Sequence, residues 1–347
     1  MTARRSEPTV PVTTPPAKDT PGATAGAVPD TVLVVGGTGF IGSAVSREMI
    51  RAVVSQRGTP TLRVMSRTTF QRSETAGVRH VTGDLSDPRS LRGVCSGVDS
   101  VVHAASYVGR DPQRCTDVNV KGTRALLAEA NRSGVRRFVY VSTASVYGAG
   151  PHRGLDERQL EPDPASPASA SRFHAEQEVR AAGGIVLRPH LVYGAGDRWF
   201  VPTVVRLLHL LPAWPIDEAR SSLVAVEDLA RVAAAVADGR VPLDRGGTYH
   251  VAHPRPVSMA LLLAKLRTAF GLPEPRGVPI AEHRALVRQT LPEVSDHQYA
   301  LLTEDHWYDT SAIWRDTGLD PGPGFERRFA SCSNWYREHV AHGLSSA

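Results

Sequence analysis

The sequence predicts an α/β fold in which a doubly wound parallel sheet carries a smaller C-terminal cap. Three observations point to it: short β-branched runs alternate with longer helical segments from Thr31 onward, several of these runs are apolar at successive positions, and a glycine-rich turn links the first run to the first helix. Strands that helices cover on both faces are apolar throughout, which is the pattern of a parallel sheet. A chain of 347 residues is long enough for such a domain with a satellite.

The apolar pattern in the first half of the chain predicts five strands and two helices. The strands are residues 31–35 (TVLVV), 61–66 (TLRVMS), 77–83 (GVRHVTG), 99–105 (DSVVHAA) and 136–143 (RRFVYVST). The helices are residues 40–53 and 112–132, which lie between strands as a βαβ fold requires.

The second half continues the alternation and then becomes helical. Pro167 opens a helix over 167–181, residues 183–194 (GGIVLRPHLVYG) predict one more buried strand, and residues 222–238 predict a strand that runs into a helix. Three further helices are predicted at 258–270, 280–297 and 325–342, separated by proline- and glycine-rich turns. We expect this last part to cover a cleft as a lid.

Composition excludes several classes of protein. The 40 Lys and Arg against 35 Asp and Glu give a net charge of +5 without any block of like charge, which favours a soluble protein over one that binds nucleic acid. No stretch approaches the roughly 18 uninterrupted apolar residues of a membrane span. Cys95, Cys115 and Cys332 form no CxxC pair, so we expect a reducing cytoplasm and no metal site.

The glycine-rich turn is the first functional signal. In VLVVGGTGFIG, the glycines directly follow a strand and open a helix. Glycine there permits a tight turn and lets backbone amides approach a pyrophosphate, while the helix N-terminus adds partial positive charge. The motif therefore predicts a Rossmann-type dinucleotide site rather than an ordinary glycine turn. The predicted loop comprises Gly36, Thr38, Gly39, Phe40, Ile41 and Gly42.

The end of the second strand indicates which dinucleotide binds. A carboxylate at this point holds the ribose hydroxyls and repels a 2′-phosphate. This chain has Ser66 and Arg67 instead, with Arg72 close behind. Arginine can donate two parallel hydrogen bonds to a phosphate, so we expect NADPH, with NADH as a possible cofactor. The alternative is that Arg67 is only a solvated surface charge.

Three regions follow from these assignments. Residues 1–30 are interrupted by proline and threonine throughout, which predicts a disordered tail rather than a signal peptide or a transit helix. Residues 31–185 are expected to form mainly the dinucleotide-binding core. Residues 186–347 are expected to interleave the last core strands with a C-terminal substrate-binding region.

A series of further motifs identifies a family resemblance. GDLSD at 83–87, HAAS at 103–106, VNVKGT at 118–123, VSTASVYG at 141–148, LRPHLVYG at 187–194 and LVAVEDLA at 223–230 follow the glycine loop. In this order they resemble the extended short-chain dehydrogenases/reductases, the class that includes nucleotide-sugar epimerases and dehydratases. The resemblance covers residues 31 to about 320.

The resemblance implies roles for residues along the cofactor. Asp84 and Leu85 would flank the adenine, and Asn119 would lie in the helix beside the cofactor. His103, which follows VV on a buried strand, is more typical of a core histidine than of a catalyst. Three residues would line the channel and two would approach the nicotinamide by their backbone: Ala104, Ala105, Ser106, and Pro189, Leu191.

Thr143 is the first candidate catalytic residue. It stands four residues before Tyr147, where the family has a serine or threonine that hydrogen-bonds the reacting carbonyl. A hydroxyl there can stabilise the negative charge that develops on the oxygen as hydride arrives. The alternative is an ordinary threonine at the end of a strand.

The chain departs from the family where a proton is normally handled. Members usually carry a tyrosine after the proline and a lysine four residues later, but this sequence has Ala168 and Arg172 at those positions. The tyrosine exchanges the proton that balances the hydride, and alanine cannot do so. Arg172 could still bind the nicotinamide ribose, although arginine is a poor acid.

Three interpretations remain. A reductase could take its proton from water, from Tyr107, Tyr147, Tyr193 or His174, or from a substrate phenol beside the ketone. A non-catalytic regulator could bind NADP without chemistry. An epimerase- or dehydratase-like enzyme could act on nucleotide sugars, although Ser221 stands where the family's phosphate-binding arginine is expected and Arg220 is one place away.

Thr143 favours an enzyme, because a regulator needs no group that polarises a carbonyl. With its proline-rich tail and the Ala168/Arg172 departure, the chain also resembles angucyclinone ketoreductases of antibiotic pathways. We therefore predict a cytoplasmic, NADPH-dependent ketoreductase that reduces a ketone of an aromatic polyketide (an angucyclinone) without the tyrosine–lysine pair, assisted by the substrate.

Four aromatic residues and two helices bear on the substrate pocket and the oligomeric state. Trp199, Phe200, Trp214 and Trp307 could form an aromatic wall or belong to the core. The protein is expected to be a monomer, or a homodimer that pairs through the helices near 112–132 and 167–181.

Overall fold

The computed structural model describes residues 31–55, 61–68, 77–216, 219–239, 241 and 243–344. The predicted tail at residues 1–30 and Arg72 lie outside the described residues. In the part that is described, no helix combines the length and the apolar character that crossing a membrane requires.

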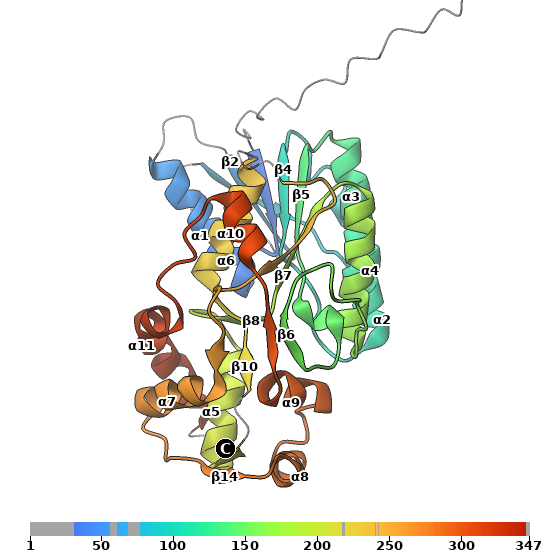
Figure 1. Cartoon of the computed structure of the whole chain (residues 1–347). Helices are drawn as coiled ribbons and strands as arrows, with labels where there is room; N and C mark the ends of the chain where they lie inside the picture. The colour runs from blue at the N-terminus through green and yellow to red at the C-terminus, as the bar shows by residue number, and fades with distance from the viewer. Residues whose placement is uncertain are drawn as a thin grey trace, which may run out of the picture.

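Seven parallel strands form the central sheet, which confirms the predicted α/β fold (Figure 1). The strand order is β12-β7-β5-β4-β1-β2-β3. All seven are short: β1 (Thr31–Val35), β2 (Thr61–Ser66), β3 (Val78–Thr82), β4 (Ser100–His103), β5 (Arg137–Val141), β7 (Ile185–Pro189) and β12 (Thr248–Val251). Strand β12 was not predicted, because its four residues TYHV give little pattern by themselves.

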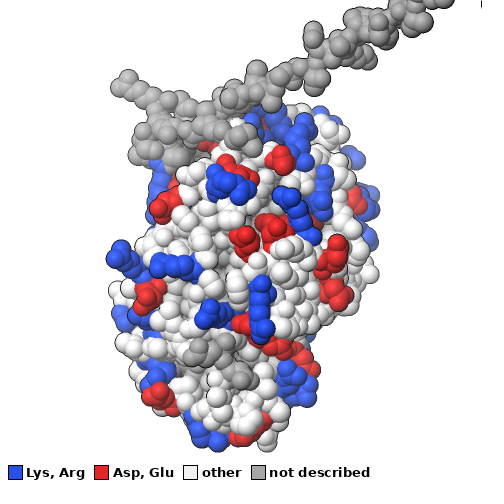
Figure 2. Space-filling view, in the orientation of Figure 1, with Lys and Arg blue, Asp and Glu red and all other residues white. Residues whose placement is uncertain are grey.

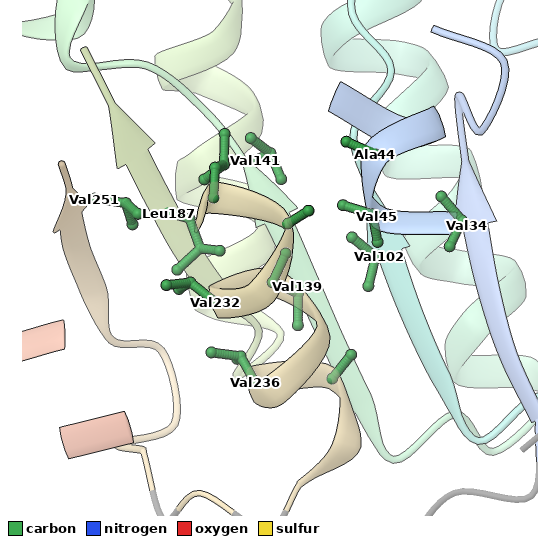
Figure 3. Packing of buried hydrophobic residues seen from close by; sticks show 14 of the residues in the cluster. Val34, Ala44, Val45, Val102, Val139, Val141, Leu187, Val232, Val236 and Val251 are labelled. Atoms are coloured by element: carbon green, nitrogen blue, oxygen red, sulfur yellow. The ribbon is translucent and has the colours of Figure 1, made fainter. Parts of the chain in front are cut away.

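Helices cover both faces of the sheet, and this explains why its strands lack an exposed side. Val34 and Val102 pack with Val45 of α1 (Phe40–Ser55) on one face, where α6 (Val226–Asp238) also lies (Figure 3). Leu33, one residue from Val34, packs on the opposite face with Leu126 of α3 (Gly122–Arg132). Helix α4 (Pro167–Ala181) lies beside α3 on that second face.

The predicted helix over 112–132 is one continuous helical run with an irregular centre. It comprises α2 (Pro112–Cys115), a π-helical turn η2 (Thr116–Lys121) and α3. Turns of this kind are rare and frequently lie at functional sites. Here the π turn contains Asn119, whose side chain is buried.

Most of the remaining elements form the cap, whose helices lie below the sheet in Figure 1 and which has a core of its own. Its helices are α5 (Phe200–Leu210), α7 (Met259–Phe270), α8 (Ile280–Thr290), α9 (Asp296–Thr303) and α11 (Phe325–Leu344), while α10 (Ser311–Thr317) packs back onto α6. Short strands complete it: β8 (Leu191–Tyr193) with β11 (Leu223–Ala225), β9 (Ala213–Pro215) with β14 (Arg276–Val278), and the order β13 (Val257–Ser258), β10 (Arg220–Ser221), β15 (His306–Tyr308), β6 (His152–Leu155).

Two predicted elements are each divided in the structure. The strand expected over 183–194 ends at Pro189, and after His190 the chain enters β8, which pairs with β11 instead of the central sheet. The helix expected over 280–297 ends at Thr290, and Ser295 begins α9 with a capping box that includes Gln298. Both divisions place polar residues at the border between core and cap.

The surface agrees with the charge pattern of the sequence. On the face drawn in Figure 2, basic and acidic side chains are interspersed rather than gathered by sign. Many of them pair, such as Lys121 with Asp117 at 2.8 Å and Arg288 with Asp296 at 2.8 Å.

Candidate active site

A cavity of about 1170 Å³ opens where the carboxyl ends of the core strands meet the cap. Ligands of open α/β sheets bind at this edge, because the loops that leave parallel strands gather there. We call it the active-site cavity. Its wall combines the glycine loop (Thr38, Gly39, Phe40), the turn after β5 (Thr143, Ser145), the start of α4 (Ser166, Ala168, Ser169, Arg172), the β7–β8 junction (His190, Leu191, Val192) and the cap (Trp199, Pro202, His297, Leu301, Trp335).

The glycine loop has the geometry that a dinucleotide needs. Gly36 has a φ of +79°, and a Cβ added to it would lie 2.8 Å from the Ala105 side chain. A Cβ on Gly42 would lie 2.1 Å from the carbonyl oxygen of Gly36, so the helix can approach the turn only without a side chain. Helix α1 carries no acidic residue in its first turn, which leaves its partial positive charge available to a pyrophosphate.

At the end of β2, one of the two side chains predicted to bind the cofactor already has a hydrogen-bond partner within the protein. Ser66 is buried and its hydroxyl donates to the Thr68 carbonyl at 2.7 Å, so this proton serves a local turn. The Arg67 side chain is exposed to solvent. The contact of Arg67 with a 2′-phosphate stays a prediction.

Asp84 and Leu85, the residues expected around the adenine, lie in the loop that follows β3, and Asp84 stabilises this loop by hydrogen bonds. Asp84 accepts hydrogen bonds from the Ser86 amide at 2.9 Å and the Ser86 hydroxyl at 2.7 Å. Burial raises the pKa of Asp84, but these hydrogen bonds and the Arg67 guanidinium bring it below its usual value. Leu85 points into the core, so a contact from it to the adenine would use its backbone.

Asn119 holds the segment that runs along the predicted cofactor channel. Its side-chain oxygen accepts the Tyr107 amide at 2.7 Å, and its amide group donates to the Tyr107 carbonyl at 2.8 Å and to the Ser171 hydroxyl at 2.9 Å. These bonds fix the chain just after Ala104, Ala105 and Ser106, all of which are half-buried. Asn119 thus shapes the channel through its neighbours. His103, expected as a core histidine, is fully buried and pairs with Thr123 at 2.9 Å.

Thr143 lies in the cavity wall at the end of β5. Its Oγ1 accepts the Ser145 amide at 3.1 Å and caps the short turn η3 (Ala144–Tyr147). The hydroxyl proton is therefore available to a ligand in the cavity. The predicted contact with a carbonyl is compatible with this geometry and stays a prediction.

Ala168 and Arg172 lie one turn apart on α4 and face the same cavity. Arg172 donates from Nη2 to the Val141 carbonyl at 3.0 Å, which ties the helix to the end of β5. Its Nε is buried and has no hydrogen-bond partner among the described residues. The contact of this guanidinium with the nicotinamide ribose stays a prediction.

Tyr147, considered above as a proton donor, is buried, and its hydroxyl is hydrogen-bonded within the protein. Its hydroxyl accepts from Arg188 at 2.7 Å and lies 2.6 Å from Nε2 of His250. Burial is the main cause that raises the pKa of Tyr147 to about 12. This tyrosine is outside the cavity wall as described.

The other three candidate donors also lie elsewhere. Tyr193 is buried in the core of the cap, Tyr107 packs under the Arg114 guanidinium at 4.5 Å, and His174 is exposed on α4 beside Gln177. None of the three lines the active-site cavity as far as the structure describes it.

Three histidines that were not predicted line the cavity: His190, His297 and His339, the last of which is exposed and pairs through Nδ1 with the Trp335 carbonyl at 2.9 Å. His190 occupies the junction of β7 and β8, and both of its ring nitrogens are buried without a partner among the described residues. His297 reaches the cavity from α9 of the cap, and its Nε2 is likewise unpartnered. The available signal for His190 was a polar residue between Pro189 and Leu191, two positions that the family pattern had already placed at the nicotinamide.

The structure decides between the two alternatives for the four aromatic residues, and only one of them lines the cavity. Trp199 lines the cavity, whereas Phe200 and Trp214 pack in the core of the cap. Trp307 lies on β15 outside the cavity wall, against Gly154. Trp335 of α11, which sequence reasoning did not select, completes the aromatic part of the wall.

Arg220 and Ser221, the candidates for binding a sugar nucleotide, lie in β10 between β13 and β15. The Arg220 amide donates to Asp305 at 2.8 Å, and Ser221 is buried. Neither lines the cavity as described. Across the described residues, no group of three His, Cys, Asp or Glu side chains could hold a metal ion, and all three cysteines are unpaired and buried.

Comparison with known proteins identifies the family. Residues 32–252 match the model of the NAD dependent epimerase/dehydratase family. A 2-alkyl-3-oxoalkanoate reductase of Stenotrophomonas maltophilia is 28% identical over 85% of this chain and 96% of its own length. A 4-hydroxy-2-methyl-3-oxo-4-farnesyl-3,4-dihydroquinoline-1-oxide ketoreductase of Stigmatella aurantiaca is 31% identical over 50% of this chain and 53% of its own.

Solved structures agree with the fold. The dTDP-glucose 4,6-dehydratase DesIV of Streptomyces venezuelae, with NAD bound, matches with a TM-score of 0.72 and 25% identity over 90% of this chain and 99% of that chain. WbmH of Bordetella bronchiseptica, in complex with NAD+, matches with a TM-score of 0.70 at 22% identity over the same shares. The family match spans the glycine loop, the Thr143 turn and the start of α4, and the chain is therefore an enzyme of the NAD dependent epimerase/dehydratase family.

Proposed function

We propose that this enzyme is an NADPH-dependent ketoreductase that acts on an aromatic polyketide ketone without a protein tyrosine as the acid. The observation that carries the proposal is the composition of the cavity wall at α4, where Ala168 and Arg172 face the ligand space beside Thr143. The wall keeps a hydroxyl that can orient a carbonyl and has no phenol among its described residues. Reductases among the relatives support this choice over a sugar-modifying activity.

The finer assignment rests on resemblance. The Ala168/Arg172 departure and the proline-rich N-terminal sequence are similar to the angucyclinone ketoreductase of simocyclinone biosynthesis. An angucyclinone carries phenols near its ketones, which suits an active site that lacks its own acid.

The residues of the cavity divide the work of such a reduction. The glycine loop and Arg172 of the cavity wall hold the cofactor, Arg67, which is exposed after β2 and outside that wall, selects its 2′-phosphate, and a bound NADPH would supply the hydride. Thr143 donates its hydroxyl proton in a hydrogen bond to the ketone oxygen, which stabilises the charge that develops there. Trp199 and Trp335 in the wall offer apolar surface to a flat aromatic ligand.

The substrate completes the proton balance. The ketone carbon gains the hydride, and the ketone oxygen takes the proton of a phenol held next to it. The ketone thus becomes an alcohol, and the phenolate that remains recovers a proton from water. Because both groups belong to one molecule, the transfer needs no further orientation by the protein.

A matched pair of substrates tests the proposal. Purified protein is incubated with NADPH and an aromatic ketone that has a neighbouring hydroxyl, or with its methyl ether. We expect reduction of the hydroxy ketone and a rate for the ether that is lower by at least about 10², the usual contribution of a positioned acid. Equal rates would remove the substrate as the acid, and no turnover of either ketone would favour a cofactor-binding regulator.

A further inference from the structure

The His190 side chain is the most exceptional polar group of the cavity. It is enclosed at the β7–β8 junction, yet neither Nδ1 nor Nε2 has a hydrogen-bond partner among the described residues. Most buried polar groups in proteins are paired, and an unpaired one reduces stability. An imidazole that keeps both nitrogens unpaired in the cavity wall indicates a ligand that pairs with it.

The packing around His190 fixes the ring without using its nitrogens. His306 of β15 stacks on it with ring centroids 5.5 Å apart and planes inclined by 15°, and Tyr308 meets it edge-on at 5.6 Å. The polar atoms of these neighbours do not pair with His190: His306 Nδ1 pairs with the Glu304 carbonyl at 3.1 Å, the Tyr308 hydroxyl pairs with His152 at 3.1 Å, and His306 Nε2 has no partner among the described residues. The ring is therefore oriented before a ligand arrives.

We propose that His190 is a substrate-binding residue that donates an imidazole N–H to the oxygen of the hydroxyl flanking the reacting ketone. The inference rests on the function proposed above and names a protein contact for the group that serves there as the acid. In a hydroxy ketone with an internal hydrogen bond, the O–H proton points to the ketone oxygen, so the lone pairs of the hydroxyl oxygen remain free to accept. His190 is placed in the wall to meet them, and His297 lies in the same wall on the cap side.

This contact strengthens during the reaction. When the hydroxyl proton moves to the ketone oxygen, the hydroxyl oxygen becomes a phenolate, and a hydrogen bond to a charged acceptor is roughly twice as strong as one to a neutral acceptor. An interaction that is stronger in the transition state than in the ground state raises kcat. His190 would thus favour the proton transfer without donating a proton itself.

The charge state of the His190 ring agrees with a role as hydrogen-bond donor rather than as acid. Burial, together with the neighbouring imidazoles of His306 and His152, holds the pKa of His190 well below its ordinary value. At neutral pH the ring then carries one proton, which it can share in a hydrogen bond but does not give up readily. The substrate hydroxyl remains the acid.

Two substitutions separate hydrogen bonding from packing. His190→Phe keeps an aromatic ring for His306 to stack on and removes both nitrogens, whereas His190→Gln restores an N–H donor. Affinity for the hydroxy ketone and for its methyl ether is measured in the presence of NADP+, where no reduction occurs, and kcat and KM are measured with NADPH. His283→Phe serves as the matched control, because His283 is buried in the cap against Tyr299 and lies outside the cavity wall.

We expect the wild type to bind the hydroxy ketone at least about tenfold more tightly than the ether, the worth of one good hydrogen bond. The ether has no proton to point to the ketone oxygen, so its methyl group turns away from that oxygen and blocks the side from which His190 donates. His190→Phe should abolish this preference and lower kcat for the hydroxy ketone, and His190→Gln should restore part of both. The melting temperature of unliganded His190→Phe should equal or exceed that of the wild type, because no hydrogen bond is lost. A structural role predicts the opposite shift.

The outcomes separate this inference from the proposed function. If the wild type reduces the hydroxy ketone and His190→Phe keeps the full preference for it, the inference is wrong and the proposed function stands. If the hydroxy ketone binds through His190 but is never reduced, the proposed function fails and the binding role stands. If the wild type shows no affinity for either ketone, both fail.

Discussion

The Thr143 side chain serves the fold and the cavity at once. Its oxygen caps the turn after β5, and its proton remains available to a ligand. We expect Thr143→Val to lower kcat for ketone reduction by about 10²-fold, as loss of one oxyanion donor does. The lost cap should also lower the free energy of unfolding by about 1 kcal/mol. Steady-state kinetics and urea unfolding measure the two effects separately.

Two variants separate the roles of Thr143. Thr143→Ser keeps the hydroxyl and should retain both activity and stability. Ser258→Ala removes the cap of α7, which accepts the Leu261 amide at 3.2 Å outside the cavity wall, and should reduce stability alone. Wild-type kcat in Thr143→Val would contradict the catalytic assignment.

Arg67 carries the prediction about the cofactor. It is the exposed cation that follows β2, whereas the hydroxyl of Ser66 donates to the Thr68 carbonyl. Arg67→Ala should weaken NADPH binding by about tenfold or more, the worth of a charged hydrogen bond, and leave NADH binding unchanged. Fluorescence titration with both cofactors measures this. Arg136→Ala is the control, because Arg136 precedes the amino end of β5, whereas Arg67 follows the carboxyl end of β2. Equal losses of NADPH affinity in both variants would contradict the assignment.

Single residues were predictable where their role depends on local sequence. The glycine loop and the turn that begins at Thr143 are short segments whose neighbours in the chain are also their neighbours in space. His190 was missed because its environment comes from distant segments, with β11 drawing the chain out of the central sheet and β15 stacking against the ring. Tyr147 could not be set aside among the alternative proton donors for the same reason, since its partner His250 is 103 residues away along the chain.

At the scale of elements, a buried ion pair fastens α4 to the sheet. Arg188 of β7 donates from Nε to the carboxylate of Glu176 of α4 at 3.0 Å, and both side chains are almost fully buried. Breaking a buried pair leaves an uncompensated charge, so Glu176→Gln should lower the free energy of unfolding by about 3–5 kcal/mol. Urea unfolding measures the loss.

The same helix offers the control for this pair. Glu178 of α4 pairs with Arg124 of α3 at the surface, where water screens the charges. Glu178→Gln should therefore cost less than about 1 kcal/mol. Similar losses for the two variants would show that the Arg188 pair contributes no more than a surface pair.

Elements were predictable where burial on both faces made them evenly apolar. The bounds of β1 and β2 agree with the prediction, and α1 extends two residues beyond it. The cap was harder, because strands of two or three residues such as β10 and β13 acquire their conformation from partners far along the chain. The break between α8 and α9 had a local signal in Pro292 and the Ser295 cap, which a purely helical reading of the segment overlooked.

At the scale of the whole molecule, the fold encloses several histidines in their neutral form. Burial, with the Arg172 charge as the second cause, lowers the pKa of His103 to about 3, and burial lowers that of His250 to about 4. Histidine in an unfolded chain has a pKa near 6.5. As pH falls below that value the unfolded state binds protons that the folded state refuses, so acid favours unfolding.

The free energy of unfolding should therefore be level above about pH 7.5 and fall as pH drops from about 6.5 toward 4, with each enclosed histidine contributing up to about 2 kcal/mol between pH 7 and 5. His103→Gln can keep the bond to Thr123 while removing one titrating group, so its stability should fall less steeply over this range. His209→Gln, at an exposed position on α5, is the control for replacing a histidine outside the core. Urea unfolding at half-unit steps of pH gives the three curves. A His103→Gln curve parallel to the wild type would show that His103 already takes up its proton in the folded protein, and the neutral state inferred for this buried histidine would then be wrong.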